Sequence, residues 1–132
     1  MFELDEKIVL VVGGRGYLGR DFCHHFKKQN ATVISADLNV VSKAASKSDY
    51  SHSQEGIVQV DIDVTDKSSV SEVVNKIVDE YGRIDILVFS VTAKPKDFYL
   101  PYTECSLEGW QSVIHAELDG VFLLTHLHTS PH

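Results

Sequence analysis

The segment KIVLVVGGRGYLG spans residues 7–19 and joins a short apolar run to a group of closely spaced glycines. Residues 8–12 are apolar and mostly β-branched, as in a strand that is buried on both faces. Gly14, Gly16 and Gly19 follow in the order G-x-G-x-x-G, and a helical pattern begins at once. In such a unit the first glycine allows a tight turn, the second lets the backbone approach a diphosphate, and the third lets the helix pack closely. Because a helix start also attracts phosphate groups, this segment predicts a dinucleotide-binding turn.

The composition of the 132 residues is that of an ordinary globular domain. Apolar residues make up 43% and charged residues 23%, so we expect one domain over residues 1–132 with a full hydrophobic core. The net charge of −7 disfavours nucleic acid and anionic membranes as partners. The start MFELDEK lacks the apolar core of a signal peptide, and no apolar run approaches the ~20 residues of a membrane span. We therefore expect a cytoplasmic protein in which Cys23 and Cys105 stay reduced.

Hydrophobic periodicity divides the rest of the chain into alternating helices and strands. The predicted strands cover residues 8–12, 31–36, 57–62 and 84–91, and helices are predicted at residues 17–29, from a cap at Thr65 or Asp66 to about Tyr81, and at residues 107–128. Residues 38–55 are predicted to form an exposed loop, with a short helix around residues 40–45. Right-handed crossovers between these strands give an α/β fold, a Rossmann-like doubly wound parallel sheet in the strand order 3-2-1-4.

The apolar residues of each helix repeat at helical spacing and predict the face that is buried. In the first helix this face contains Leu18, Phe22 and Phe26, with Cys23 alongside. In the last helix the predicted stripe comprises Trp110, Val113, Ile114, Leu118, Val121, Phe122 and Thr125. Leu123, Leu124 and Leu127 add apolar surface around much of the remaining circumference of that helix.

The fourth strand and the last helix have more apolar surface than this fold would cover. The order 3-2-1-4 leaves residues 84–91 at an edge of the sheet, although the strand has a single charge, Asp85, near its start. A helix that is apolar on more than one side expects more than one partner. We therefore expect a homo-oligomer, or a chain prone to aggregation, through the last helix and the edge of the fourth strand.

Asp37 follows the second strand and lies 21 residues after Gly16. The dinucleotide fingerprint has a carboxylate at this distance, where it binds the adenosine ribose hydroxyls; a capping or turn aspartate is the alternative. The carboxylate would also repel a 2′-phosphate and so favours NAD, whereas Arg15 could meet that phosphate and favours NADP. We expect NAD, with NADP as the second option, because a like charge beside the phosphate is hard to offset.

Residues 92–106 leave the carboxyl end of the fourth strand, where ligands bind in such sheets. Lys94 and Lys96 stand among several aromatic residues there, so this loop could meet an anionic or sugar-like small-molecule substrate, or it could be a solvated surface loop. The substrate itself stays unknown. The adjacent His24 and His25 point apart, which favours solvated surface. His126 and His128 are two residues apart and do not share a helix face, so a frayed polar end is favoured for them and for His132, and we predict no metal site.

Several segments together resemble the short-chain dehydrogenase/reductase family over nearly the whole chain. They are VVGGRGYLG at residues 11–19, Asp37, DVTD at 63–66, GRIDILV at 82–88 and WQSVIHAELDGVF at 110–122. By this resemblance, Asp63 and Val64 would contact the adenine, and Thr92 and Ala93 would lie near the nicotinamide-side ribose. The cofactor-binding residues expected from the glycine motif and the resemblance are Gly13, Gly14, Arg15, Gly16, Tyr17, Leu18, Gly19, Asp37, Asp63, Val64, Thr92 and Ala93.

The chain also departs from the family pattern. Gly13, Gly16 and Gly19 give the spacing G-x-x-G-x-x-G, which resembles the extended branch that often handles nucleotide-linked sugars. Residues 89–92 stand where N-N-A-G is usual, and Glu117 stands where the last helix usually has an asparagine. The catalytic Tyr-x-x-x-Lys is absent, since the residues four positions after the five tyrosines are Asp21, Gln54, Asp85, Thr103 and Ser106. We therefore assign no catalytic residue and expect the chain to be an N-terminal cofactor-binding portion that stops before the catalytic half.

The resemblance implies an NAD(P)-dependent oxidoreductase that moves a hydride between the nicotinamide and an alcohol or carbonyl substrate. We expect this chain to supply dinucleotide binding and not to turn over alone. One alternative is a non-catalytic nucleotide-binding or interaction module. The other is a nucleotide-sugar epimerase, dehydratase or reductase, which the glycine spacing and the loop with lysines and aromatic residues would favour.

Overall fold

The computed structural model describes residues 3–38 and 56–129. The elements are β1 Ile8–Val12, α1 Tyr17–Lys28, β2 Thr32–Asp37, β3 Val58–Asp61, α3 Lys67–Tyr81, β4 Ile86–Phe89, α4 Leu107–Ile114 and α5 Gly120–Thr129. A 3₁₀ turn, Tyr102–Glu104, precedes α4, and a π-helical turn, His115–Asp119, joins α4 to α5. The short helix expected around residues 40–45 lies outside the described residues.

The four strands form one parallel sheet in the order β3-β2-β1-β4, as predicted. β1 pairs with a strand on each side, so that Val12 lies opposite both Ala36 of β2 and Phe89 of β4. All five residues of β1 are buried, which explains why this strand is apolar without alternation. The predicted Rossmann-like doubly wound sheet is therefore confirmed.

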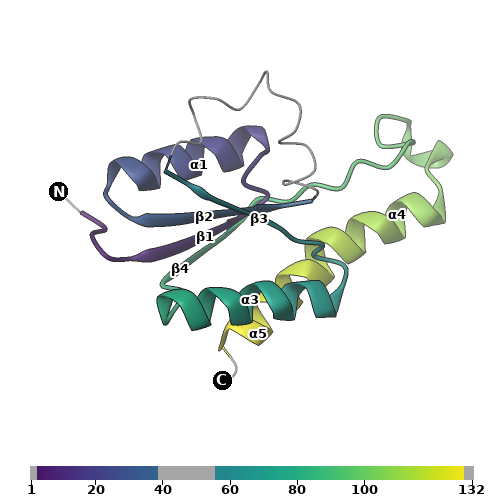
Figure 1. The fold of residues 1–132 in the computed structure, drawn as a ribbon. Helices are drawn as coiled ribbons and strands as arrows, with labels where there is room; N and C mark the ends of the chain where they lie inside the picture. The colour runs from purple at the N-terminus through teal and green to yellow at the C-terminus, as the bar shows by residue number, and fades with distance from the viewer. Residues whose placement is uncertain (1–2, 39–55, 130–132) are drawn as a thin grey trace.

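Helices cover both faces of the sheet, with α1 above it in Figure 1 and α3 and α5 below it. On the α1 face, Cys23 and Phe26 pack with Val9, Val11 and Val33. On the other face, buried apolar residues of α3 and α5 pack against the alternate side chains of the same strands. The core there includes Leu10, Val12 and Ile34 from the strands, and Val70, Val74, Ile77 and Leu124 from the helices. The loop after β4 and α4 extend beyond the carboxyl edge of the sheet (Figure 1).

The ends of the helices follow local sequence signals. Asn30 directly follows α1 and its C-cap and has a φ of 66°, the left-handed conformation that asparagine tolerates. Asp66 is the N-cap of α3 and accepts a hydrogen bond from the Ser68 N–H at 2.9 Å. Gly82 ends α3 with a φ of 86°. The sequence predicted either Thr65 or Asp66 as the N-cap of α3, and in the structure the N-cap is Asp66.

The predicted buried stripe of the last helix is wrong. The buried residues of this segment are Gly109, Ala116, Gly120 and Leu124, whereas Trp110 is 61% exposed and Phe122 is 64% exposed. A Cβ added to Gly120 would lie 3.1 Å from the side chains of Val64 and Phe89. Gly120 therefore lets the helix approach Val64 and Phe89 closely and Leu124 fills the buried face, whereas Trp110, Leu118 and Phe122 lie on the outer side.

The predicted buried face of the first helix is correct for Cys23 and Phe26 and wrong for Leu18 and Phe22. Leu18 is 64% exposed and Phe22 is also exposed, while Gly19 and Cys23 are buried and Phe26 is half-buried. α1 begins close to the turn that precedes it, so a small residue is needed on the inner side of its first turn. The four-residue spacing of large apolar residues therefore identified Phe26 correctly but not Leu18 and Phe22.

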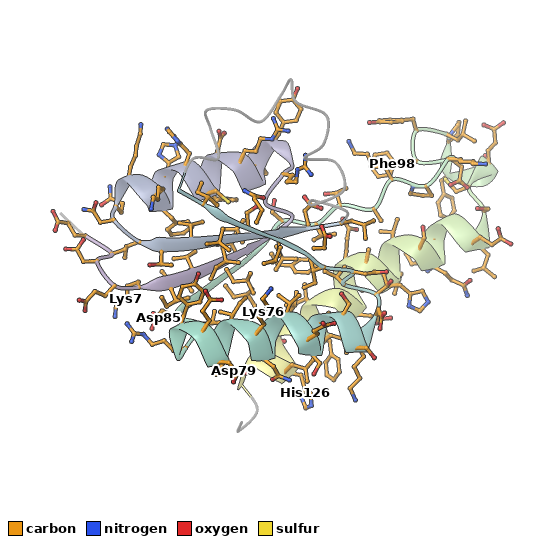
Figure 2. The ribbon with its side chains drawn as sticks, in the orientation of Figure 1. Lys7, Lys76, Asp79, Asp85, Phe98 and His126 are labelled. Atoms are coloured by element: carbon orange, nitrogen blue, oxygen red, sulfur yellow. The ribbon has the colours of Figure 1, made fainter. Side chains whose placement is uncertain are left out.

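Asp85 ties the start of β4 to the start of β1. Its Oδ2 accepts a hydrogen bond from the Ile8 N–H at 2.7 Å, and its own N–H donates to the Ile8 carbonyl at 2.8 Å. Arg83 Nε donates to the same carboxylate at 2.9 Å, and Arg83 Nη2 donates to the Glu6 carbonyl at 2.7 Å. The Ile8 N–H, with Arg83 and the neighbouring Lys7 (Figure 2), holds the pKa of Asp85 below its ordinary value, although desolvation acts in the opposite direction.

We expect Asp85→Asn to lower the free energy of unfolding by about 1 kcal/mol near neutral pH, because it removes the charge that Ile8 and Arg83 bind. Since folding lowers this pKa, the stabilisation is complete above the unfolded value of about 4 and is lost as the pH falls through the folded value. The difference between wild type and variant should therefore shrink in acid. Urea unfolding across this range measures it.

Asp79→Asn is the matched control for this experiment, because Asp79 is an exposed aspartate of α3 at a distance from the β1–β4 pair (Figure 2). It should leave the free energy of unfolding unchanged. Equal stability of the wild type and Asp85→Asn at neutral pH would contradict the role assigned to the carboxylate.

Candidate functional site

Gly13 begins the turn between β1 and α1. Its φ of 85° lies in the left-handed region, which favours glycine. The Gly13 N–H donates to the Ala36 carbonyl of β2 at 2.8 Å, and a Cβ added to Gly13 would overlap the Ser90 carbonyl next to β4. The turn therefore packs between the ends of two strands. The motif predicted that Gly14 allows the tight turn. In the structure, the residue with the positive φ is Gly13, one position earlier.

Gly14 and Gly19 allow close packing within the turn. A Cβ on Gly14 would overlap the Ser35 hydroxyl of β2. A Cβ on Gly19 would overlap the Gly13 carbonyl oxygen and lie 2.8 Å from the Gly14 Cα. Gly19 thus allows the close approach of helix and turn that the motif predicts for its third glycine.

Gly16 has open space on its outer side. A Cβ there would have the Gly13 carbonyl oxygen, at 3.5 Å, as its nearest neighbour, which is an ordinary contact. Gly16 is also the N-cap of α1 and has no side chain to bond the N–H groups of the first turn. The helix therefore begins with exposed glycine backbone, the arrangement that favours an anion at a helix start.

Asp37 joins the end of β2 to the glycine turn. Its Oδ2 accepts a hydrogen bond from the Arg15 N–H at 3.0 Å, and its Oδ1 accepts one from the Leu38 N–H at 2.7 Å. Arg20 Nε donates to the Arg15 carbonyl at 2.9 Å, so the backbone of Arg15 is bound on both sides. The structure thus brings Asp37 beside the turn, where its carboxylate makes the contacts of a turn aspartate and also faces the crevice described below.

The DVTD segment after β3 forms a turn that is stabilised by hydrogen bonds to its own side chains. Asp63 Oδ1 accepts hydrogen bonds from the Thr65 N–H at 3.0 Å and from the Thr65 hydroxyl at 2.6 Å. The Asp63 N–H donates to the Ser69 hydroxyl at 2.9 Å, and Asp66 caps α3. Val64, between these polar residues, is buried. This part of the motif therefore holds β3 to α3 as well as facing the crevice.

Two adjacent cavities lie along the carboxyl ends of the strands. The Asp63 cavity has a volume of about 230 Å³, and its lining includes Asp37, Asp63, Val64, Thr92 and Ala93. The Gly16 cavity has a volume of about 390 Å³, and its lining includes Gly16, Tyr17, Leu18, Asp37, Thr92 and Lys94. Because Gly13, Asp37, Val91 and Thr92 line both, the two cavities form one crevice that crosses the β1–α1 turn.

Nine of the twelve residues predicted for cofactor binding line this crevice: Gly13, Gly16, Tyr17, Leu18, Asp37, Asp63, Val64, Thr92 and Ala93. Gly14, Arg15 and Gly19 do not line it and instead form the turn itself. The prediction of cofactor-binding residues omitted Val12, Leu38, Ile62, Thr65, Ser90, Val91 and Ala116, and it considered Lys94 only as a possible substrate contact. Most of these directly follow strands, and the rule that ligands bind at the carboxyl ends of parallel strands could have found them. Ala116 comes from the π-helical turn and has no such signal.

The loop of residues 92–106 divides between two places. Thr92, Ala93 and Lys94 line the crevice. Phe98 and Tyr102 instead line a separate cavity of about 560 Å³ together with Trp110 of α4. The first residues of the loop therefore lie at the ligand crevice, whereas Phe98 and Tyr102 belong to the second cavity.

Cys23 does not line the crevice. Cys23 lies buried under α1, and this burial raises the pKa of its thiol, so that it stays protonated and unreactive. Within residues 3–38 and 56–129, no group of three histidine, cysteine or carboxylate side chains could hold a metal ion. No helix in the described part of the chain is long and apolar enough to cross a membrane.

Residues 7–131 match the short chain dehydrogenase family. The 3-oxoacyl-[acyl-carrier-protein] reductase FabG of Thermotoga maritima is 32% identical over 125 residues, which cover 95% of this chain and 50% of the relative. The solved glucose/ribitol dehydrogenase of Brucella melitensis, a short-chain dehydrogenase/reductase, is 27% identical with a TM-score of 0.77, over 96% of this chain and 52% of that one.

A solved short chain dehydrogenase of Leptospira borgpetersenii with bound NAD+ has the same fold, with 21% identity and a TM-score of 0.77 over 96% of this chain and 46% of that one. The chain spans about half the length of the relatives it matches. With its strand order, its glycine turn and a family match over residues 7–131, this chain belongs to the short-chain dehydrogenase family.

Proposed function

We propose that the crevice binds a dinucleotide, with its diphosphate at the β1–α1 turn and its adenosine in the Asp63 cavity. The observation that carries this proposal is the position of Asp37, which contacts the turn through the Arg15 N–H at 3.0 Å and lines both cavities. A ligand with its diphosphate at Gly16 would thus have its adenosine ribose beside a carboxylate.

The residues present fit such a cofactor. Gly16 has no side chain where a phosphate would approach, and its neighbourhood on that side is open. Val64 and Ile62 give the Asp63 cavity apolar walls, which suit an adenine ring. By family resemblance, Asp63 and Val64 would contact the adenine, and Thr92 and Ala93 would lie at the nicotinamide-side ribose. The bound nicotinamide would supply hydride transfer, and these residues would bind and orient it.

We infer that NAD is preferred over NADP. The Asp37 carboxylate can accept hydrogen bonds from ribose hydroxyls, and it would repel a 2′-phosphate at the same position. Arg15 lines neither cavity, although its backbone bonds to Asp37, so its side chain gives weaker support for NADP than the sequence alone suggested. The neighbour of this fold that was solved with NAD+ supports the same choice.

Titration with NADH and with NADPH, followed by nicotinamide fluorescence, tests this preference. The wild type should bind NADH more tightly. Asp37→Asn keeps the size of the side chain and one acceptor for the Arg15 N–H, but it removes the charge. We expect roughly tenfold weaker NADH binding, because charge-assisted hydrogen bonds to the ribose are lost, and no loss of NADPH binding.

Asp61→Asn is the matched control, because Asp61 lies opposite Asp37 in the β2–β3 register but lines neither cavity. It should leave both affinities unchanged. Tighter binding of NADPH than of NADH by the wild type, or an unchanged NADH affinity in Asp37→Asn, would overturn the role proposed for Asp37.

We further propose that the reaction served by this crevice is oxidation of an alcohol or reduction of a carbonyl group. The matched relatives bear the names of a reductase and a dehydrogenase with different substrates, so they support the reaction type and leave the substrate open. The sequence contains no Tyr-x-x-x-Lys, the pair that in this family moves the proton. The proposed role of this chain is therefore cofactor binding without turnover on its own.

We also propose that the outer face of the last helical segment associates with another copy of this chain. Large apolar side chains lie exposed there: Trp110, Leu118 and Phe122, which were predicted to be buried, and also Leu107. The nearby strand β4 forms the edge of the sheet, and its four residues are only half-buried. An exposed apolar helix face beside an apolar sheet edge favours association.

Light scattering tests this second proposal. The wild type should be oligomeric or aggregation-prone, and Leu118→Lys combined with Phe122→Lys should lower the average mass, because two charges then occupy the exposed apolar face. Gln111→Lys, at an exposed polar position of α4, is the control and should not lower it. A monodisperse monomeric wild type would refute the proposal.

A further inference from the structure

Charge is unevenly distributed along the crevice. The Asp63 cavity has two carboxylates in its lining, Asp37 and Asp63, and no lysine or arginine. The Gly16 cavity shares Asp37 with it, but lacks Asp63 and adds one lysine, Lys94, together with the start of α1. An elongated ligand with a neutral sugar at one end and an anionic group toward the other would match this order of charges.

Lys94 is held where it lines the Gly16 cavity. It follows β4 by five residues and lies two residues after Thr92, which lines the same cavity. Its Nζ lies 5.9 Å from the centroid of the Phe98 ring, within the range of a cation–π contact. The Phe98 ring packs edge to face on Tyr99 at 4.9 Å, on the loop beyond the carboxyl edge of the sheet (Figure 2). The ring contact restricts the lysine without neutralising it.

The ammonium group is available to an external anion. Lys94 forms no ion pair with the residues that the structure describes, and its side chain is exposed. Phe98 and Tyr102 of the same loop line the separate cavity beside α4, and Lys96 does not line the crevice, so Lys94 is the lysine of this loop that brings a positive charge to it. A lysine can donate three hydrogen bonds to phosphate oxygens.

We propose that Lys94 binds the diphosphate of the dinucleotide from the β4 side of the crevice, opposite the first turn of α1. The inference rests on the proposed dinucleotide binding and adds a cationic side chain to it. The sequence left open whether the lysines of this loop meet a substrate or solvent. Because Lys94 lines the same cavity as Gly16, where the diphosphate is proposed to bind, we assign Lys94 to the cofactor phosphates.

Calorimetric titration with ADP-ribose and with adenosine tests this assignment, because the two probes differ by the diphosphate and its attached ribose. Lys94→Met should weaken ADP-ribose binding by roughly threefold to tenfold, the range of a partly exposed charge pair, and leave adenosine binding unchanged. Lys94→Arg should retain most of the ADP-ribose affinity. The loss in Lys94→Met should be larger at low salt than at high salt, since screening weakens the contact in the wild type.

Lys96→Met is the matched control, because Lys96 is an exposed lysine of the same loop that lines neither cavity. It should leave ADP-ribose binding unchanged. Equal ADP-ribose affinity in the wild type and Lys94→Met would overturn this inference and leave the proposed function in place. An equal loss of adenosine and ADP-ribose binding in Lys94→Met would overturn it as well, by showing an effect on the fold. A wild type that binds neither ADP-ribose nor NADH would overturn the proposed function and this inference together.

Discussion

The lack of room for a side chain at the β1–α1 turn is the constraint on which the rest of the structure depends. Gly13 adopts a left-handed φ of 85° between the ends of β2 and β4, and Gly19 lies so close to Gly13 that a Cβ would overlap its carbonyl oxygen. This packing sets where α1 begins relative to the central strand. It also leaves Gly16 on the open side of the turn, where a ligand can approach backbone atoms.

The same turn explains how Asp37 serves two purposes. Its carboxylate bonds to the Arg15 N–H, which holds the turn against β2, and it also lines the crevice beside the turn. A structural role and a proposed binding role therefore coincide in one side chain. Asp37 lines both cavities, Asp63 lines the cavity proposed for the adenosine, and Lys94 adds a positive charge on the side of Gly16.

The order of the strands and the positions of most crevice residues could be predicted because they depend on local sequence. A buried strand, a glycine turn and an acid at the next strand end are each readable from a short segment, and parallel pairing brings those ends together. The buried faces of α1 and of the last helix could be predicted only in part. Close packing of Gly19 on the turn and of Gly120 on Val64 and Phe89 leaves Leu18 and Phe122 outside, and the spacing of large apolar residues does not reveal how close two elements will pack.

The central claim is that backbone amides at the start of α1 bind the diphosphate while Asp37 binds the adenosine ribose. Amide chemical shifts of the isotopically labelled chain during titration with NAD+ test it most directly. The account predicts the largest changes at Gly16, Tyr17 and Leu38, and none at Gly82, which lies at the end of α3. Changes centred on Trp110 and the cavity beside α4, with the glycine turn unaffected, would contradict it.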